Sequence, residues 1–317
     1  MKKTFLLVFM MIICMNAIAR NLFNFSISLI NLPFPPYQRN IIRLIETEKG
    51  DLYGIISQSP FNKGKIIIIE GTDKIHERER LPDDILQVDS IIFNPDLTWT
   101  WDRSFKKIIT LNNSGVLEIY EGNGPGKQIM KISGTRPFEP QGYQISRSFA
   151  LDKTGNLYTA GKDGFLFKFD PETQKIEKLN IRLPSVRGRE PWASLDASAL
   201  ADDGTIFLGT FDGYIAQFNP ETQTIVNLGK PLRQQRIQTL IFFKKNLFGI
   251  GGEPDGLPRW FIYNPETRGF QLGGTLKDEK NRLIYEFVNT AILRKDGTII
   301  GSFSGRLGSL FKIETGK

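Results

Sequence analysis

An internal repeat of about 49 residues constrains the fold of this chain more than any other feature of its sequence. One unit covers residues 149–179 and reads FALDKTGNLYTAGKDGFLFKFDPETQKIEKL, and the next covers 198–228 and reads SALADDGTIFLGTFDGYIAQFNPETQTIVNL. Three pairs of markers share one offset of 49 residues: Gly155 with Gly204, Gly164 with Gly213, and Pro171 with Pro220. Self-similarity at a fixed period is typical of repeat architectures, so the unit sets the frame for the assignments that follow.

Further copies of the unit extend along the chain. They lie at residues 246–272, in the last segment up to Lys317, and in weaker form at 49–56 and 106–122. The spacing from Gly50 to Gly297 averages 49.4 residues over five steps. At that spacing residues 20–317 divide into six units.

Each unit is typical of short strands separated by tight turns. Phe165, Phe167 and Phe169 alternate as one face of a strand requires. The following Asp170-Pro171-Glu172-Thr173 has the turn formers Asp and Pro at its first two positions, and Asp163-Gly164 is a hairpin signal. Units of four strands repeated six times predict an all-β chain folded as a six-bladed β-propeller.

The two ends of the chain predict how such a ring closes. The last unit supplies only three strands, whereas the alternating segment Phe25–Leu29 resembles a fourth strand. We therefore expect the N-terminal strand to complete the last blade, which removes exposed sheet edges. The alternative, an open solenoid, needs terminal units of atypical sequence to act as caps, and none is apparent.

Residues 1–19 have the pattern of a secretory signal peptide. Lys2 and Lys3 precede an apolar run of 11 residues, and the segment ends in Ala17-Ile18-Ala19. The apolar run is too short for a transmembrane helix, and no later stretch is long enough. The expectation is an exported protein, periplasmic or extracellular, with residues 20–317 as a single propeller domain. Cys14 offers a lipidation alternative, which the preceding Ile13 disfavours.

Composition excludes several kinds of catalytic site. The chain has one Cys and one His, which removes Ser-His-Asp hydrolysis, Cys-His proteolysis, zinc sites and a disulfide framework from consideration. The formal net charge is +7, and it falls to +5 when Lys2 and Lys3 leave with the signal peptide. Outside the cytoplasm a mildly basic chain favours anionic glycans or membrane surfaces over nucleic acid as partners.

The Asp-Gly hairpins and the F-[DN]-P-E-T turn resemble the repeats of gluconolactonase/regucalcin and streptogramin lyase-like propellers. The resemblance covers all six units but rests on structural positions, so it implies a fold and says little about activity. The streptogramin lyase-like enzymes use histidines beside a metal, and the only histidine here, His76, lies in a charged run typical of a solvated strand. Gluconolactonase-like enzymes hold a divalent cation with Glu, Asn and Asp in the central channel, and that chemistry remains open.

Residues just before each first strand are expected to line the mouth of the central channel. Alignment of the units places Arg147, Asp196 and Asn289 at one repeat position, with Arg236 one step earlier and Glu286 shortly before Asn289. Asp196, Glu286 and Asn289 supply the hard oxygen ligands that calcium prefers. The alternative is that the carboxylates form ion pairs with Arg147 and Arg236 and hold no metal.

The predicted connections between blades are rich in arginine and contain two notable aromatic residues. Arg187 and Arg189 share a connection with Trp192, and Tyr143 precedes Arg147. Guanidinium forks pair with carboxylate, sulfate or phosphate, and an exposed indole stacks on a sugar ring. An anionic glycan is therefore the expected ligand; the alternative is that the connections are merely polar and Trp192 packs in the core.

These features predict an exported β-propeller that binds a ligand, an anionic carbohydrate above all, without catalysis. One alternative is a divalent-metal-dependent lactonase or lyase that uses the central channel. Another is a protein-interaction scaffold, which would use the propeller rim to bind a protein partner. No phosphate-binding glycine loop is present, and the basic pairs Lys106-Lys107 and Lys244-Lys245 fall in predicted turns, so a nucleic-acid partner is not expected.

Overall fold

The structure is a computed structural model. It describes residues 23–35, 39–47, 49–56, 65–70, 74–78, 87–88, 98–102, 107–111, 117–121, 125–132, 148–160, 164–170, 172–173, 175–190, 193–233, 236–252, 257–304 and 309–315. These residues form strands and turns, with no α-helix among them. The described chain accordingly contains no helix with the length and apolarity needed to cross a membrane.

Five sheets have four antiparallel strands each. Their strands are β2 (Ile41–Glu46), β3 (Leu52–Ile56), β4 (Lys65–Glu70) and β5 (Lys74–Arg78); β11 (Ala150–Leu151), β12 (Leu157–Ala160), β13 (Phe165–Asp170) and β14 (Lys175–Arg182); β15 (Leu195–Leu200), β16 (Ile206–Thr210), β17 (Ile215–Asn219) and β18 (Thr224–Gly229); β19 (Ile237–Phe243), β20 (Asn246–Gly251), β21 (Arg259–Asn264) and β22 (Gly269–Thr275); and β23 (Val288–Leu293), β24 (Ile299–Phe303), β25 (Ser309–Thr315) and β1 (Phe23–Asn31).

A further sheet has five strands. These are β7 (Thr98–Asp102), β8 (Lys107–Leu111), β9 (Leu117–Glu121), β10 (Pro125–Ile132) and the short β6 (Gln87–Val88). β6 pairs parallel with β10, so this sheet has one strand more than the repeat predicts. The all-β class and the four-stranded antiparallel unit are confirmed.

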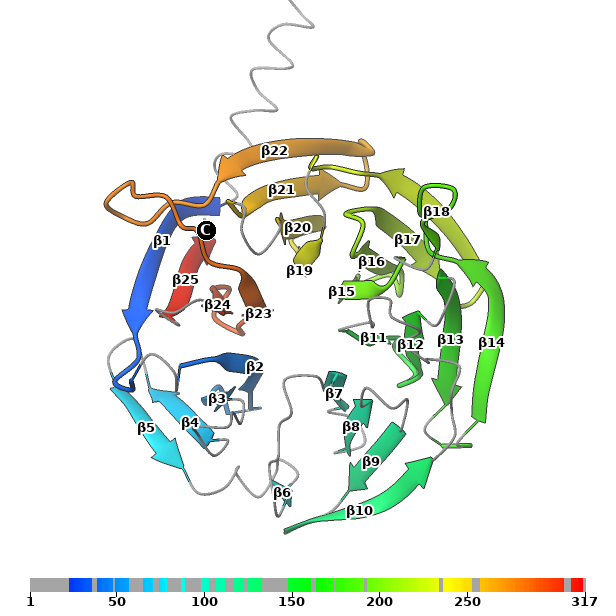
Figure 1. Cartoon of the computed structure of the whole chain (residues 1–317), viewed down its shortest axis with the longest axis horizontal. Coiled ribbons are helices and arrows are strands. Elements are labelled where there is room, and N and C mark those ends of the chain that lie inside the picture. Colours follow the sequence, from blue (N-terminus) through cyan, green and yellow to red (C-terminus); the bar gives the residue numbers. More distant parts are fainter. Residues whose placement is uncertain are drawn as a thin grey trace, which may run out of the picture.

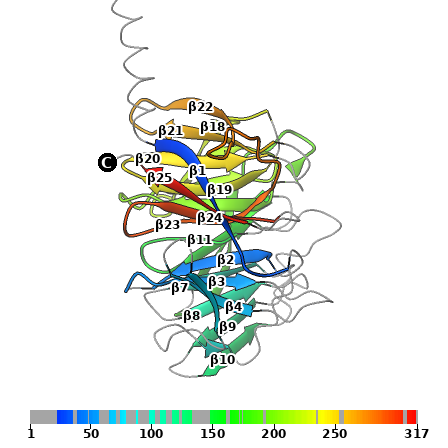
Figure 2. The ribbon, with the colours of Figure 1, turned by 90° about the vertical axis from the view of Figure 1, so that its left-hand side faces the viewer.

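The sheets follow one another around a central axis in the order of the sequence (Figure 1). The strands β2, β7, β11, β15, β19 and β23 lie nearest the axis, and the strands β5, β10, β14, β18, β22 and β1 lie at the outside (Figure 1). Seen from the side, the sheets occupy a slab that is narrower than the ring is wide (Figure 2). The starts of the first strands β15, β19 and β23 are therefore brought close to the axis.

The repeat markers lie at turns that need their residue types. Gly155 and Gly204, between the first and second strands of their sheets, have φ angles of 88° and 93°, which residues with a Cβ rarely adopt. Asp170 and Asn219, between the third and fourth strands, accept hydrogen bonds through Oδ1 from backbone N–H groups two and three residues later. These turns fix the strand spacing in each unit.

The hydrophobic core lies between neighbouring sheets. One cluster joins Phe207 and Leu240 across two sheets, and another joins Phe248 and Phe311. Burial falls from the axis outward: β16 is buried at every position, whereas no position of β18 or β22 is fully buried. Single sheets of this kind have apolar surface on both faces of their inner strands, so they are stabilised by stacking against their neighbours.

The sheets at the two ends of the chain meet at what we call the terminal junction, between β2–β5 and the sheet of β23, β24, β25 and β1. β1 pairs antiparallel with β25, and the segment Phe25–Leu29 singled out in the sequence lies within β1. Ser302 Oγ donates a hydrogen bond to the Ile41 carbonyl at 2.7 Å. The N-terminal strand is thus the outer strand of the sheet formed by the C-terminal residues.

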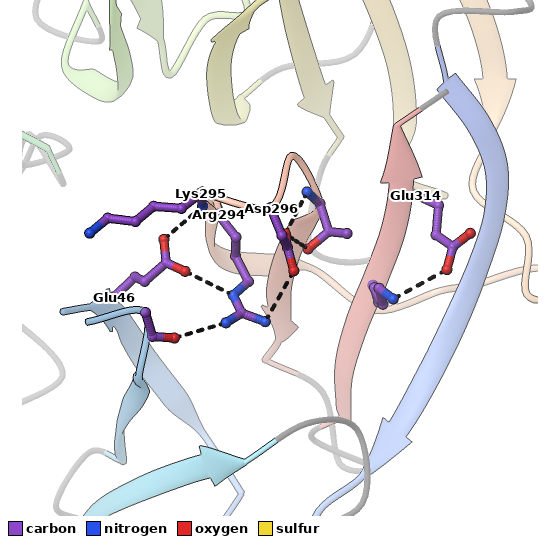
Figure 3. A network of polar contacts seen from close by, with 8 residues as sticks. Glu46, Arg294, Lys295, Asp296 and Glu314 are labelled. Carbon is purple, nitrogen blue, oxygen red and sulfur yellow. Dashed lines mark hydrogen bonds and ion pairs between the residues drawn. The ribbon is translucent and has the colours of Figure 1, made fainter. Parts of the chain in front are cut away.

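A charged network crosses the terminal junction (Figure 3). Arg294 Nε lies 3.1 Å from Glu46 Oε1, and the Lys295 amide donates to Glu46 Oε2 at 2.9 Å. Arg294 Nη2 donates to the Gly50 carbonyl at 2.9 Å, and Asp296 lies 3.6 Å from Nη1. Both oxygens of Glu46 and all three nitrogens of the guanidinium therefore have partners.

Candidate functional site

The first strands of four sheets carry a β-bulge near their start. The pairing with the second strand shifts between Leu195 and Ala197, Ile237 and Thr239, Val288 and Thr290, and Ile41 and Arg43. The residues that the ladders skip are Asp196, Gln238, Asn289 and Ile42. A bulged residue is released from the ladder and its side chain is redirected. Asp196 and Asn289 thus share a structural position, as their alignment in the repeat predicts, and Gln238 joins them.

Each of the three polar bulge residues bonds to the start of the next sheet. Gln238 accepts a hydrogen bond from the Val288 amide at 2.9 Å and donates to the Gly252 carbonyl at 2.7 Å. Asn289 Nδ2 donates to the Ile41 carbonyl at 3.1 Å and to Asn40 Oδ1. Asp196 accepts from Arg236, the residue before β19. The bulges therefore provide polar links between neighbouring inner strands.

The link between β15 and β19 is a buried ion pair. Arg236 Nε lies 2.9 Å from Asp196 Oδ2, with 6% and 3% of the two side chains exposed. The guanidinium carbon lies 4.9 Å from the ring centre of Phe211 and 5.0 Å from that of Phe287. Arg236 Nη2 has no hydrogen-bond partner among the described residues. A charge in these surroundings is costly to bury, and its position is held by two aromatic rings and one carboxylate.

The backbone of Arg236 is strained as well. Its φ angle is 63°, in the left-handed region, and its amide donates to the Phe211 carbonyl. A non-glycine residue in this region costs about 1 kcal/mol or more, and such residues concentrate at ligand sites. The sequence alignment predicts Arg236 one step before the repeat position of Asp196. The strand registers place Arg236 two steps before that position, because it directly precedes Ile237 as Ser194 directly precedes Leu195, and the bulged residue follows.

A second ion pair lies beside the first. Arg189 Nη2 is 2.7 Å from Asp212 Oδ1, with the arginine partly exposed and the aspartate buried. Burial raises the pKa of Asp212, and the nearby Arg189 and Lys230 offset only part of that effect. The Phe211 amide donates to the Ser194 carbonyl at 3.0 Å, which places this turn against the start of β15. We call the residues Arg189, Ser194, Asp196, Phe211, Asp212, Arg236 and Phe287 the β15/β19 site.

The structure brings together only part of the predicted site. Tyr143, Arg147 and Trp192 lie outside the described residues, so their predicted roles in the site stay predictions. Arg187 is exposed in the connection that also carries Arg189, and Glu286 is partly buried beside Phe287.

The predicted calcium ligands are engaged in other contacts. Asp196 Oδ2 accepts from Arg236, and the Asn289 amide nitrogen bonds to Asn40 and Ile41. Among the described residues no three or more His, Cys, Asp or Glu side chains are grouped as a metal site would need. The ion-pair alternative for Asp196 and Arg236 is the arrangement that the structure has.

Sequence reasoning missed Gln238, Ser194 and Asp212 as members of this region. The sequence predicts Asp212 only as part of an Asp-Gly hairpin turn, the counterpart in the repeat of Asp163-Gly164, and Gly213 has the positive φ of 84° that such a turn needs. The position of Gln238 is hidden because the bulge adds one residue to a strand without changing the length of the repeat. His76, in contrast, is exposed on β5, the environment predicted for it.

No family model matches the sequence, and no curated protein matches it. Solved structures do share the fold. A catalytically inactive virginiamycin B lyase from Staphylococcus aureus, solved with quinupristin, aligns with a TM-score of 0.56 and 13% identity over 91% of this chain and 98% of the lyase.

Two other solved structures extend the comparison. The extracellular domain of the hybrid two-component system BT3049 from B. thetaiotaomicron aligns with a TM-score of 0.55 and 16% identity over 91% of this chain, which spans 42% of that solved domain. Sqt1 from Saccharomyces cerevisiae aligns with a TM-score of 0.51 and 11% identity over 87% of this chain and 73% of Sqt1. At these identities the likeness shows the fold alone. The protein has an all-β, propeller-like fold, and its resemblance to lyase-type propellers is confirmed at the level of the fold.

Proposed function

We propose that this protein is an exported β-propeller that binds an anionic carbohydrate at the β15/β19 site and performs no chemistry on it. The observation that carries the proposal is the state of Arg236: its guanidinium is buried beside the rings of Phe211 and Phe287, and its Nη2 has no hydrogen-bond partner among the described residues. An arginine with a purely structural role would be expected to use all of its donors. An unused donor beside aromatic faces is what a ligand oxygen would bind.

The surroundings of the site support an acidic ligand. Arg187 and Arg233 are exposed in the connections that lead to β15 and β19, and Arg189 is partly exposed. Their charges lie on the same end of the inner strands as Arg236, where they would attract carboxylate or sulfate groups. Extracellular domains among the structures with this fold are compatible with an exported protein.

The proposal includes the architecture that positions the site. Residues 20–317 form a single domain in which the six sheets are the blades of a propeller, and the pairing of β1 with β25 closes the ring. Residues 1–19 are a cleaved signal peptide that directs the protein to the periplasm or the medium. Mass measurement of the protein recovered from its exported fraction tests the cleavage after Ala19.

Binding of labelled oligogalacturonate and heparin fragments, measured by fluorescence anisotropy at low and high salt, tests the function. We expect Arg187→Ala to weaken binding about two- to fivefold, as loss of one exposed charge contact does. Arg268→Ala is the matched control, because Arg268 is an exposed arginine in the turn between β21 and β22, at the other end of the sheet.

Binding is expected to fall as salt is raised, because exposed charges are screened. Arg236→Lys keeps the charge but loses the planar fork, and it is expected to lose most of the affinity. Absence of binding to either glycan at low salt, or equal effects of Arg187→Ala and Arg268→Ala, contradicts the proposal.

A further inference from the structure

Three buried polar atoms without hydrogen-bond partners in the described part of the chain belong to residues of the β15/β19 site. They belong to Ser194, Asp212 and Arg236, whose residues are each at most 5% exposed. Ser194 Oγ, Asp212 Oδ2 and Arg236 Nη2 have no hydrogen-bond partner among the described residues. Buried polar atoms are nearly always hydrogen-bonded, so three exceptions in one place call for a physical reason.

Backbone hydrogen bonds hold these residues side by side. The Ser194 carbonyl accepts from the Phe211 amide at 3.0 Å, and the Phe211 carbonyl accepts from the Arg236 amide at 2.6 Å. Asp212 follows Phe211 directly and is anchored through its other oxygen to Arg189. The three atoms thus belong to one small region and come from three successive segments of two sheets.

The chemistry of the three atoms differs from that of an anion site. Arg236 is paired with Asp196 and Arg189 with Asp212, so the charges of the region balance. Arg236 Nη2 can only donate, Asp212 Oδ2 accepts, and the Ser194 hydroxyl does both. A sulfate or phosphate group has only acceptors at its disposal and would be repelled by the Asp212 carboxylate. A pair of sugar hydroxyls can accept from the arginine and donate to the aspartate.

We infer that Ser194, Asp212 and Arg236 form a hydroxyl-binding subsite for one sugar residue of an acidic polysaccharide, so that the protein selects polyuronates over polyanions without hydroxyl groups. The inference rests on the proposed function and adds the group that the buried atoms recognise. The ring centres of Phe211 and Phe287 lie 4.9 and 5.0 Å from the Arg236 guanidinium carbon, so apolar surface lies beside the subsite. The exposed Arg187 then takes the carboxylate.

Two probes separate hydroxyl recognition from simple charge attraction: oligogalacturonate and a polyphosphate of matched charge. Ser194→Ala is expected to weaken oligogalacturonate binding about two- to tenfold, the effect of losing one hydrogen bond. Asp212→Asn keeps the shape of the side chain but loses the charged acceptor, and it is expected to weaken oligogalacturonate binding about tenfold or more. Polyphosphate binding is expected to be unchanged by Ser194→Ala and unchanged or stronger in Asp212→Asn.

Matched controls lie nearby. Ser198→Ala removes a serine hydroxyl of β15 that bonds to the Phe149 carbonyl at 2.9 Å, and Asp203→Asn changes an exposed turn aspartate. Both are expected to bind oligogalacturonate like wild type. Circular dichroism and urea unfolding check that each variant is folded. Ser194→Ala is expected to be as stable as wild type, since its hydroxyl has no partner to lose among the described residues.

The outcomes distinguish this inference from the proposed function. If wild type binds oligogalacturonate and Ser194→Ala and Asp212→Asn bind it equally well, the subsite is wrong and the proposed function stands. If polyphosphate binds as tightly and is weakened by the same variants, the region recognises anions and the inference is overturned. If wild type binds no acidic glycan, the proposed function fails, and the subsite fails with it.

Discussion

Two junctions between neighbouring sheets each contain an ion pair of an arginine with a carboxylate, but the two arginines differ in how many of their nitrogens have partners. At the terminal junction, Arg294 pairs with Glu46, and the remaining nitrogens and the second carboxylate oxygen are bonded to Gly50, Asp296 and Lys295. At the β15/β19 site, Arg236 pairs with Asp196 at a similar distance, but its Nη2 has no partner among the described residues. One arginine is fully used by the fold, and the other is not.

The positions of the two pairs agree with this difference. Glu46 ends β2 and Arg294 follows β23, so their pair lies where the first strands end. Asp196 and Arg236 lie where β15 and β19 begin, at the end that carries the connections between sheets. Connections vary more freely than strand ladders and are the usual place for binding residues on a rigid scaffold. The first junction therefore has the contacts of a structural pair, and the second has the donor, unused among the described residues, on which the proposed ligand site rests.

The largest effect is expected from Glu46→Ala at the terminal junction. The substitution leaves the Arg294 guanidinium without its buried carboxylate, and breaking such a pair costs about 3–5 kcal/mol of unfolding free energy. Urea unfolding measures the loss. Glu314→Ala is the control, since Glu314 pairs with Lys312 in the same sheet but 60% of its side chain is exposed. Glu314→Ala is expected to lower the unfolding free energy by about 0–1 kcal/mol. Equal losses of unfolding free energy in the two variants would contradict a structural role for Glu46.

Replacing both members of each pair by apolar residues sharpens the comparison. Arg236→Met alone leaves the buried Asp196 carboxylate without its partner and lowers the unfolding free energy. The double variant Asp196→Leu with Arg236→Met removes both charges and is expected to recover about 2 kcal/mol or more of that unfolding free energy. The same exchange at Glu46 and Arg294 is expected to recover less, because the Lys295 amide and the Gly50 carbonyl lose their partners.

Urea unfolding of the singles and doubles at both junctions gives the two recoveries. The wild-type protein, in which both ion pairs are intact, is the reference for both sets of variants. Equal recovery at both junctions would show that the two ion pairs serve the fold in the same way. That result would remove the reason for assigning Arg236 to a ligand.

The parts of the structure that the sequence predicts depend on local chemistry. Gly155 and Gly204 mark turns because only glycine readily adopts their φ angles, and Asp170 marks a turn because its carboxylate caps the following amides. Repetition of these signals at one spacing makes the unit of four strands visible. The alternating segment Phe25–Leu29 was recognisable as a strand for the same reason, and it lies in β1.

The site was predicted less completely because it depends on contacts between units. A bulge is a property of a strand pair, so nothing in the single strand identifies Gln238 as the counterpart of Asp196. The two aromatic rings beside Arg236 come from different units, since Phe211 lies in the turn after β16 and Phe287 lies just before β23. Alignment of the repeat units predicted Asp196 and Arg236 near the starts of first strands, and they lie at the start of β15 and just before β19. Which atoms keep a free bonding position is decided only by the tertiary arrangement.

A smaller effect concerns the pH dependence of stability, where the two regions have opposite signs. Burial raises the pKa of Asp212, so its contribution to stability is fully present below the ordinary aspartate pKa and is lost as pH rises through the raised value. Burial also acts on Asp296, but hydrogen bonds from Thr298 and the charge of Arg294 lower its pKa overall. Its contribution is present above the ordinary aspartate pKa and is lost as pH falls.

Two asparagine variants measure these contributions separately. Urea unfolding between about pH 3 and 7 is compared with wild type for Asp212→Asn and Asp296→Asn. Relative to wild type, the stability of Asp212→Asn is expected to improve as pH rises, and that of Asp296→Asn to worsen. If both variants lose stability relative to wild type as pH rises, the folded protein stabilises the ionised form of Asp212, as it does that of Asp296, and the expectation for Asp212 is wrong.

The smallest expected effect is that of divalent cations on the β15/β19 site. A calcium site raises the unfolding free energy by about 2.7 kcal/mol when calcium is at 100 times its dissociation constant. Asp196 Oδ2 already accepts from Arg236 at 2.9 Å, and a guanidinium so close repels a cation. Thermal unfolding with EDTA and then with millimolar calcium or magnesium is therefore expected to give the same midpoint. A rise that Asp196→Ala abolishes would instead favour the metal-dependent lactonase or lyase, because a cation would then compete with Arg236 for the same carboxylate.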